Sequence, residues 1–168
     1  MAELTRREIE TLIASADGGG VNLACRDLSG IVLAGMNLQG ANLTSTNLTG
    51  ADLKEVDFSV NPRSETAAVL VRANLNGANL EGANLVGVNL AGAHLDAANF
   101  SGTNLQDANL SIEGNDSVSL RGANLRNANL SRANLTGADL TGADLTGADL
   151  TYTSFYQATL KDVVGYEA

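Results

Sequence analysis

The chain has 168 residues and a formal charge of −9, with 44% hydrophobic residues, 4% aromatic residues and no tryptophan. This hydrophobic content excludes a disordered chain, the length suits a single domain spanning 1–168, and a net negative charge argues against direct binding of nucleic acid. A single cysteine, Cys25, excludes an internal disulfide and a multi-cysteine metal site.

The start of the chain, residues 1–8, contains no apolar run of the kind found in signal peptides. No segment of the sequence approaches the roughly 18 consecutive apolar residues of a membrane-spanning helix. We therefore expect a cytoplasmic protein that makes no contact with a membrane.

The first predicted element is a short helix over residues 5–16. Thr5 and Glu8 have the spacing of a capping box, and Leu4, Ile9, Leu12, Ile13 and Ala16 form one apolar stripe. Three glycines, 18–20, end the helix. We interpret it as a cap that folds over the first turn of the following structure, with a partner-binding helix as the alternative.

A five-residue repeat follows the helix. Leucine or phenylalanine recurs at every fifth position over 23–58, 70–110 and 120–160, and Asn115 stands at the corresponding position between the last two ranges. A small residue, usually Ala, stands two positions earlier, and Asn or Asp stands one position earlier. The strict triplet Ala-(Asn/Asp)-(Leu/Phe) occurs 13 times, as in Ala73-Asn74-Leu75. Such regularity identifies a repeat architecture.

The period of five fits neither standard element. On an α-helix each step of five turns by about 140°, and on a flat strand an odd period sends alternate leucines to opposite faces. The two positions between triplets are rich in Gly, Ser, Thr and Asn, which favour turns. The chain must therefore bend at every repeat around an axis lined by Leu and Ala. The five-residue period alone does not fix whether the coil has three sides or four.

The A-(D/N)-L-x-x pattern resembles the pentapeptide-repeat proteins, and the resemblance covers about residues 21–160. It implies an all-β solenoid, a right-handed quadrilateral β-helix in which four repeats make one 20-residue turn. The helix at the start and the long run of Ala-Asn-Leu copies look most like cyanobacterial members. The turns are expected over 21–58 and 70–160.

Two interruptions are predicted to leave the coil. The first, at 59–69, contains the only proline, and because proline lacks the N–H that a ladder needs, we expect a protruding loop. The second, at 111–117, keeps the five-residue frame, and it is either a bulged side or a second small loop. Each is either a recognition element or a tolerated insertion.

The C-terminal end concentrates most of the few aromatic residues, in the order Tyr152, Phe155, Tyr156 and Tyr166. We expect residues 161–168 to cap the last turn, with a homodimer interface at this end as the alternative.

No constellation of residues predicts catalysis. His94 has no second His or Cys near it, and Asp139, Asp144 and Asp149, five residues apart, should face away from one another on successive sides. We expect no catalytic, cofactor-binding or metal-binding residues, no cofactor, and no enzyme activity.

The sequence therefore predicts a non-catalytic scaffold or protein-interaction module whose partner is unidentified. The candidate partner contacts are Pro62, Arg63, Glu65, Tyr152, Tyr156 and Tyr166. The resemblance also implies an alternative, because some pentapeptide-repeat proteins are dimeric rods that mimic B-form DNA and bind type II topoisomerases such as gyrase.

Overall fold

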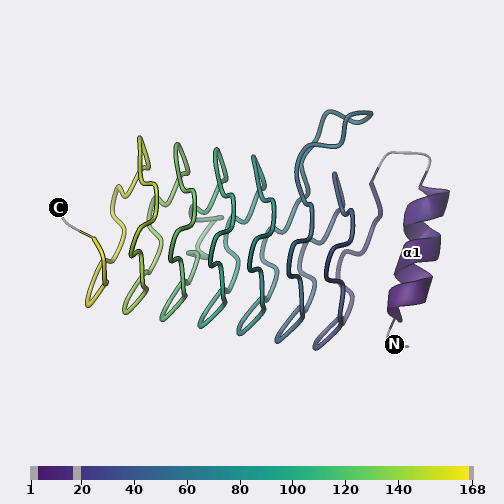
Figure 1. The fold of residues 1–168 in the computed structure, drawn as a ribbon, viewed down its shortest axis with the longest axis horizontal. Helices are drawn as coiled ribbons and strands as arrows, with labels where there is room; N and C mark the ends of the chain where they lie inside the picture. Colours follow the sequence, from purple (N-terminus) through teal and green to yellow (C-terminus); the bar gives the residue numbers. More distant parts are fainter. Residues whose placement is uncertain (1–3, 17–19, 167–168) are drawn as a thin grey trace.

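The computed structural model describes residues 4–16 and 20–166, which form one helix followed by a straight solenoid (Figure 1). Helix α1 spans Arg6–Ser15, with Thr5 and Ala16 as its caps. The Thr5 hydroxyl accepts the Glu8 N–H (3.3 Å), and the Glu8 carboxylate accepts the Thr5 N–H (2.7 Å). Ile9 is fully buried, so α1 lies with its apolar face against the first turn, as a cap requires. Of the three glycines predicted to end the helix, residues 18 and 19 lie outside the described residues.

Parallel β-bridges between successive turns hold the solenoid together. Asn22 bridges Asn42, its counterpart one turn later, and in that pair the Leu23 N–H donates to the Asn42 carbonyl (2.8 Å) while the Asn42 N–H donates to the Val21 carbonyl (2.9 Å). One residue per side is bridged, so the described residues contain single bridges and no longer strands.

The bridges sort the outward Asn/Asp positions into four rows, which settles the number of sides left open by the sequence. We name these rows sides A to D. Side A carries Asn22, Asn42, Val69, Asn89, Asn109, Asn134 and Ser154; side B carries Asp27, Asn47, Asn74, His94, Ser119, Asp139 and Thr159; side C carries Val32, Asp52, Asn79, Asn99, Asn124, Asp144 and Val164; side D carries Asn37, Asp57, Asn84, Asn104, Asn129 and Asp149.

Each corner is a four-residue turn. At the first one, the Arg26 N–H donates to the Leu23 carbonyl (3.3 Å), and Cys25, the third residue of the turn, has φ +57°. A positive φ at the third residue but not at the second defines a type II turn. This geometry explains why glycine recurs at the third residue of the turn, as at Gly77, where φ is +66°.

The core consists of the repeated leucines and alanines that point inward. In the first turn Leu23, Leu28, Leu33 and Leu38 have at most 2% of their surface exposed, and each buried leucine contributes on the order of 2 kcal/mol. Thr103 occupies an inward position that alanine holds in most repeats. Its buried hydroxyl has a hydrogen-bond partner, because it donates to the Leu80 carbonyl (2.8 Å).

The first interruption ends two residues earlier than expected from the sequence. Asn42 bridges Val69, 27 residues on, whereas regular turns advance by 20. The Ala68 N–H donates to the Phe58 carbonyl (2.9 Å), which closes the corner. The loop therefore spans 59–67 rather than 59–69, and Val69 belongs to the wall.

The second interruption is a small loop, and the alternative of a bulged side is wrong. His94 bridges Ser119, 25 residues on, so one whole repeat has been added without forming a side. Glu113 and Asp116 form an antiparallel bridge around Gly114 (φ +63°). Because the added length equals one repeat, the five-residue spacing of the sequence is the same before and after the loop.

The C-terminal end continues the wall through the last described residues. Val164 bridges Asp144 on side C, so 161–166 extend the final turn where the sequence predicted the cap 161–168. Residues 167 and 168 of that prediction lie outside the described residues. Several inward side chains of this turn remain half-buried: Ala148, Leu150, Phe155, Ala158, Leu160, Val163 and Tyr166.

Candidate interaction surfaces

Asn61 organises the loop 59–67. Its backbone N–H donates to the Thr66 carbonyl (2.8 Å), and its carbonyl accepts the Glu65 N–H (2.8 Å), so the loop closes on itself. The Asn61 side chain also donates to the Gln39 carbonyl of the preceding turn (3.3 Å). A Cβ at Gly40 would lie 2.9 Å from the Asn61 Cβ. The loop is therefore a fixed projection that rests on the neighbouring corner.

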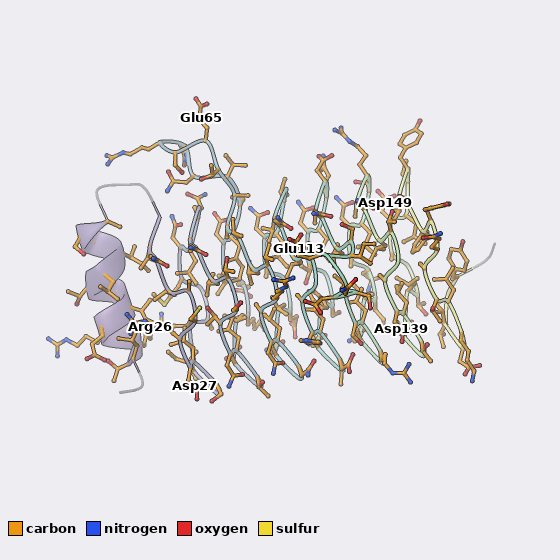
Figure 2. The ribbon with its side chains drawn as sticks, turned by 180° about the vertical axis from the view of Figure 1, so that it is seen from behind. Arg26, Asp27, Glu65, Glu113, Asp139 and Asp149 are labelled. Atoms are coloured by element: carbon orange, nitrogen blue, oxygen red, sulfur yellow. The ribbon has the colours of Figure 1, made fainter. Side chains whose placement is uncertain are left out.

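The predicted contact residues of this loop lie at its tip. Pro62, Arg63 and Glu65 are all exposed, and Glu65 points away from the solenoid at the top of the rod (Figure 2). Glu65 has φ +56°, an unusual backbone value for a residue other than glycine.

The loop 111–117 is held by a cation from an earlier turn. The Arg72 guanidinium pairs with the Asp116 carboxylate (2.8 Å) and donates to the Glu113 carbonyl (3.5 Å). A Cβ at Gly92 would meet the Glu113 Cβ at 3.1 Å, and one at Gly137 would meet Ile112 Cγ2 at 2.7 Å. The loop thus packs on the corners before and after it.

The three candidate tyrosines fall into two classes. Tyr152 and Tyr156 are 86% and 68% exposed on the last corners of the rod. Tyr166 is half-buried and packs edge-on against Phe155, with ring centroids 5.4 Å apart. Tyr166 is therefore part of the open end of the core, whereas the other two project from the rod.

The structure brings the two loops and the exposed tyrosines to the borders of one side. The corner between sides D and A holds the loop 59–67 and Tyr152, and the corner between sides A and B holds the loop 111–117 and Tyr156. In Figure 2 the Glu65 and Glu113 labels mark the two loops at different heights on the same view. Sequence reasoning missed this grouping, although counting repeats modulo four, with each insertion assigned to a corner, would have found it.

Asp139 and Asp144 are paired with arginines from the preceding turn. Arg121 donates to Asp139 (2.8 Å) and Arg126 donates to Asp144 (3.0 Å). Hydrogen bonds from Thr146, together with Arg126, lower the pKa of Asp144 to about 2, and hydrogen bonds from Thr141 and Arg121 lower the pKa of Asp139. These carboxylates are charged structural groups on adjacent sides and do not converge.

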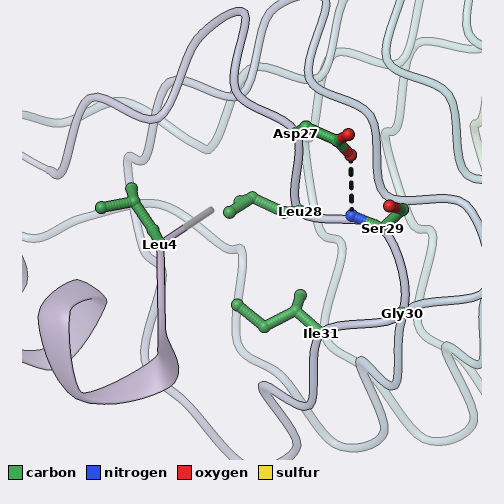
Figure 3. A pocket seen from close by; sticks show the side chains of 6 residues that line it. All are labelled: Leu4, Asp27, Leu28, Ser29, Gly30 and Ile31. Carbon is green, nitrogen blue, oxygen red and sulfur yellow. Dashed lines mark hydrogen bonds between the residues drawn. The ribbon is translucent and has the colours of Figure 1, made fainter. Parts of the chain in front are cut away.

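A shallow pocket of about 230 Å³ lies between the start of α1 and the first turn (Figure 3). Leu4, Leu28 and Ile31 supply apolar walls, and Asp27 lies at its edge. The Asp27 carboxylate already accepts the Ser29 N–H (3.2 Å) and the Asn47 amide (2.9 Å). The pocket is a seam beneath the cap rather than an assembly of reactive groups.

The described residues contain no metal-binding cluster and no membrane-spanning helix. Within 4–16 and 20–166, no three His, Cys, Asp or Glu side chains are grouped so that they could hold a metal ion. Helix α1, the one helix in this part of the chain, is too short and too polar to cross a membrane.

Comparison with known proteins gives a consistent family. The profile of pentapeptide repeats matches eight copies, over residues 27–59, 73–111, 116–151 and 128–164. No curated protein sequence gives a significant match. A crystal structure of the pentapeptide-repeat protein Rfr23 from the cyanobacterium Cyanothece 51142 is similar, with 36% identity, 79% of this chain and 90% of that chain covered, and a TM-score of 0.55.

Two other solved structures are more distant. HetL, a pentapeptide-repeat protein involved in heterocyst differentiation regulation in Nostoc sp. strain PCC 7120, is 25% identical over 99% of both chains, with a TM-score of 0.40. QnrB1, a plasmid-mediated fluoroquinolone resistance protein, is 22% identical over 84% of this chain and 78% of that chain, also with a TM-score of 0.40. Because the repeat profile matches most of the sequence, the chain belongs to the pentapeptide-repeat family and has its right-handed quadrilateral β-helix fold.

Proposed function

We propose that this protein is a non-catalytic scaffold that binds another protein. The observation that carries the proposal is the pair of anchored loops on a rigid wall. Loops fixed on a rigid scaffold are common sites of recognition, and preformed loops lose little conformational entropy on binding. We place the protein in the cytoplasm, where an exposed thiol such as that of Cys25 stays reduced.

We propose that the protein is not catalytic because of how its titratable groups are arranged. General acid–base chemistry needs groups that converge on one substrate. Here Asp139, Asp144 and Asp149 lie on sides B, C and D, and two of them are already paired with arginines.

The experiment removes one loop while keeping the wall intact. Deleting residues 60–66 and adding the substitution Ala67→Gly leaves a normal two-residue corner, serine followed by glycine, between Phe58 and Ala68. We expect such a variant to fold and to lose the complexes that the native chain forms in its own cells, as detected by chemical cross-linking and mass spectrometry. Deleting residues 112–116 removes the second loop in the same way and tests its contribution separately. If both variants keep every complex, the loops are tolerated insertions and the proposal fails.

The alternative of a DNA mimic receives little support from the charges. Asp52 and Asp144 on side C are separated by three uncharged rungs, and Asp57 and Asp149 on side D are separated in the same way. A mimic needs a continuous acidic stripe along the rod. A gyrase supercoiling assay tests this alternative, and we expect no inhibition by purified protein at micromolar concentration.

We also propose that the C-terminal end pairs with a second copy of the chain. The N–H groups of Leu130 and Leu135 donate to the next turn at 2.8 Å, whereas those of Leu150 and Phe155 make no such bond within the described residues. Half-buried apolar side chains surround these groups. The C-terminal end of a second copy offers matching apolar surface and backbone hydrogen-bonding partners. Because α1 covers the N-terminal end of each copy, association stops at a dimer. Sedimentation equilibrium should give a dimer that Leu160→Asp converts to a monomer; a monomeric native chain contradicts this proposal.

A further inference from the structure

Side A differs from the other three sides in charge. None of its seven bridged positions, from Asn22 to Ser154, carries an ionisable side chain. Each of the other sides carries two aspartates: Asp27 and Asp139 on side B, Asp52 and Asp144 on side C, and Asp57 and Asp149 on side D. In a chain with a formal charge of −9, side A is therefore neutral at its bridged positions, and the charges nearest to it, such as the Arg132–Asp107 ion pair, lie on its borders.

Hydrogen-bonding groups cover this neutral side. Asn89 and Asn109 are half-exposed, and the Asn109 amide donates to the Asn89 side-chain oxygen (3.1 Å). The same Asn89 oxygen accepts the Ala91 N–H (3.1 Å). The side chains are thus held in fixed orientations, with their remaining donors and acceptors directed to solvent.

Both borders of side A are raised and fixed. On one border Asn61 holds the loop 59–67 against Gln39, and on the other Arg72 holds the loop 111–117 through Asp116. These anchors make the borders rigid before any partner arrives, which favours binding of a preformed shape.

Tyr152 stands on a border of side A with an exposed ring. Its φ is +59°, as at other corner residues such as Asp107 and Arg132, and 86% of its surface is exposed. Glycine occupies the same corner position at Gly87. Because packing within the chain does not use the ring, a role in an interface explains it, and tyrosine is enriched among interface residues that contribute most to binding.

We propose that side A is the binding surface for a protein partner whose contact surface is uncharged and rich in hydrogen-bonding groups, seated between the loops 59–67 and 111–117. This inference rests on the proposed scaffold function and adds the surface and the chemistry of the partner. Charged partner groups placed against side A would lose water without gaining an opposite charge. A nucleic acid would find no lysine or arginine at the bridged positions to neutralise its phosphates.

The test compares matched positions on opposite sides of one turn. Asn89 on side A and Asn99 on side C share two contacts: each side-chain oxygen accepts an amide from the next turn (3.1 and 2.9 Å) and the N–H two residues ahead (3.1 Å in both). The Asn99 amide also donates to the Asn79 side chain (3.1 Å). A photo-cross-linking amino acid, benzoylphenylalanine, is placed at one or the other position in the full chain and expressed in the native cells. We expect a protein adduct from residue 89 and none from residue 99.

A charge placed on each side completes the test. Asn109→Lys on side A is expected to lower the yield of that adduct roughly tenfold or more, because the lysine would be desolvated without a partner. Asn124→Lys on side C, which loses an equivalent amide bond to the preceding turn, should leave the yield unchanged. Equal melting temperatures for the two variants confirm that both fold.

The outcomes separate the inference from the function on which it rests. Adducts from residue 99 alone, or equal adducts from both positions, overturn the assignment to side A but leave a protein-binding scaffold. Adducts with nucleic acid or lipid overturn both, and no adduct from either position overturns the assignment to side A alone. An adduct from residue 89 that Asn109→Lys does not weaken contradicts the neutral chemistry of the partner.

Discussion

The two ends of the solenoid differ in how they close the same core. At the N-terminal end, α1 covers the first turn, and Ile9, Leu23 and Val21 are between 0 and 5% exposed. At the C-terminal end, residues of the last turn with the same inward positions, such as Leu150 and Leu160, stay half-buried. The inward leucine pattern continues at both ends, so the difference in leucine burial comes from what lies against each end.

This difference teaches that the repeat specifies the wall but not its ends. Each turn contacts only its neighbours, and an end turn lacks one of them. The sequence before residue 20 leaves the repeat and forms a capping box, whereas residues 150–164 keep the five-residue period to the last bridge. An end that keeps the period offers the next turn's binding surface to another molecule, which is the basis of the proposed dimer.

The largest effect is expected from removing the cap. Ile9→Asp places a charge at a fully buried position, and it should lower the free energy of unfolding by about 4 kcal/mol or more, because the packing of the isoleucine is lost and the new carboxylate must be desolvated. Urea denaturation followed by circular dichroism measures the loss. The control is Leu12→Asp on the same helix, where the leucine is 37% exposed and the loss should stay small. Equal losses for the two variants would mean that α1 does not seal the core.

A smaller effect is expected at the open end, and two phenylalanines provide the comparison. Phe100 is fully buried in the middle of the rod and Phe155 is half-buried in the last turn. Phe100→Ala should cost about 3–5 kcal/mol, and Phe155→Ala roughly half as much in dilute protein. Because a second copy would cover Phe155, its cost should grow with protein concentration while that of Phe100 stays constant. Concentration-independent values for both variants would argue against the proposed dimer.

The sequence predicted the wall well because a single physical rule, one bend per five residues, repeats along it. Residues that follow the rule, such as Leu75 and Leu80, were placed inside, and they are buried. The second loop could not be distinguished from a bulged side, because its added length equals one repeat. The grouping of the two loops at the borders of side A could have been found by counting repeats in fours, with each insertion assigned to a corner. Of the candidate contacts, Tyr166 is half-buried with its ring packed on Phe155, and the other five are exposed.

The smallest effect is expected from acid, since the groups concerned are near the surface. The pKa of Asp144 in the folded chain is about 2, below the ordinary value of 3.8, because Thr146 and Arg126 hydrogen-bond to the carboxylate. A carboxyl group with a lowered pKa stabilises the folded state above its unfolded pKa, and this contribution is lost as the pH falls through the folded value. Stability should therefore decline between pH 3.8 and about 2.

The variant that isolates this contribution is Asp144→Asn, which keeps the shape but cannot ionise. Its free energy of unfolding should fall less steeply than that of the native chain over this pH range, as urea titrations at a series of pH values would measure. Glu8→Gln provides the comparison at the other end, where hydrogen bonds from the Thr5 backbone and hydroxyl lower the pKa of Glu8. If hydrogen exchange at low pH accelerates first in α1 for the native chain, then acid opens the cap before the last turns. If the turns around Asp144 exchange first, the uncovered end is the weaker one, as its half-buried leucines indicate.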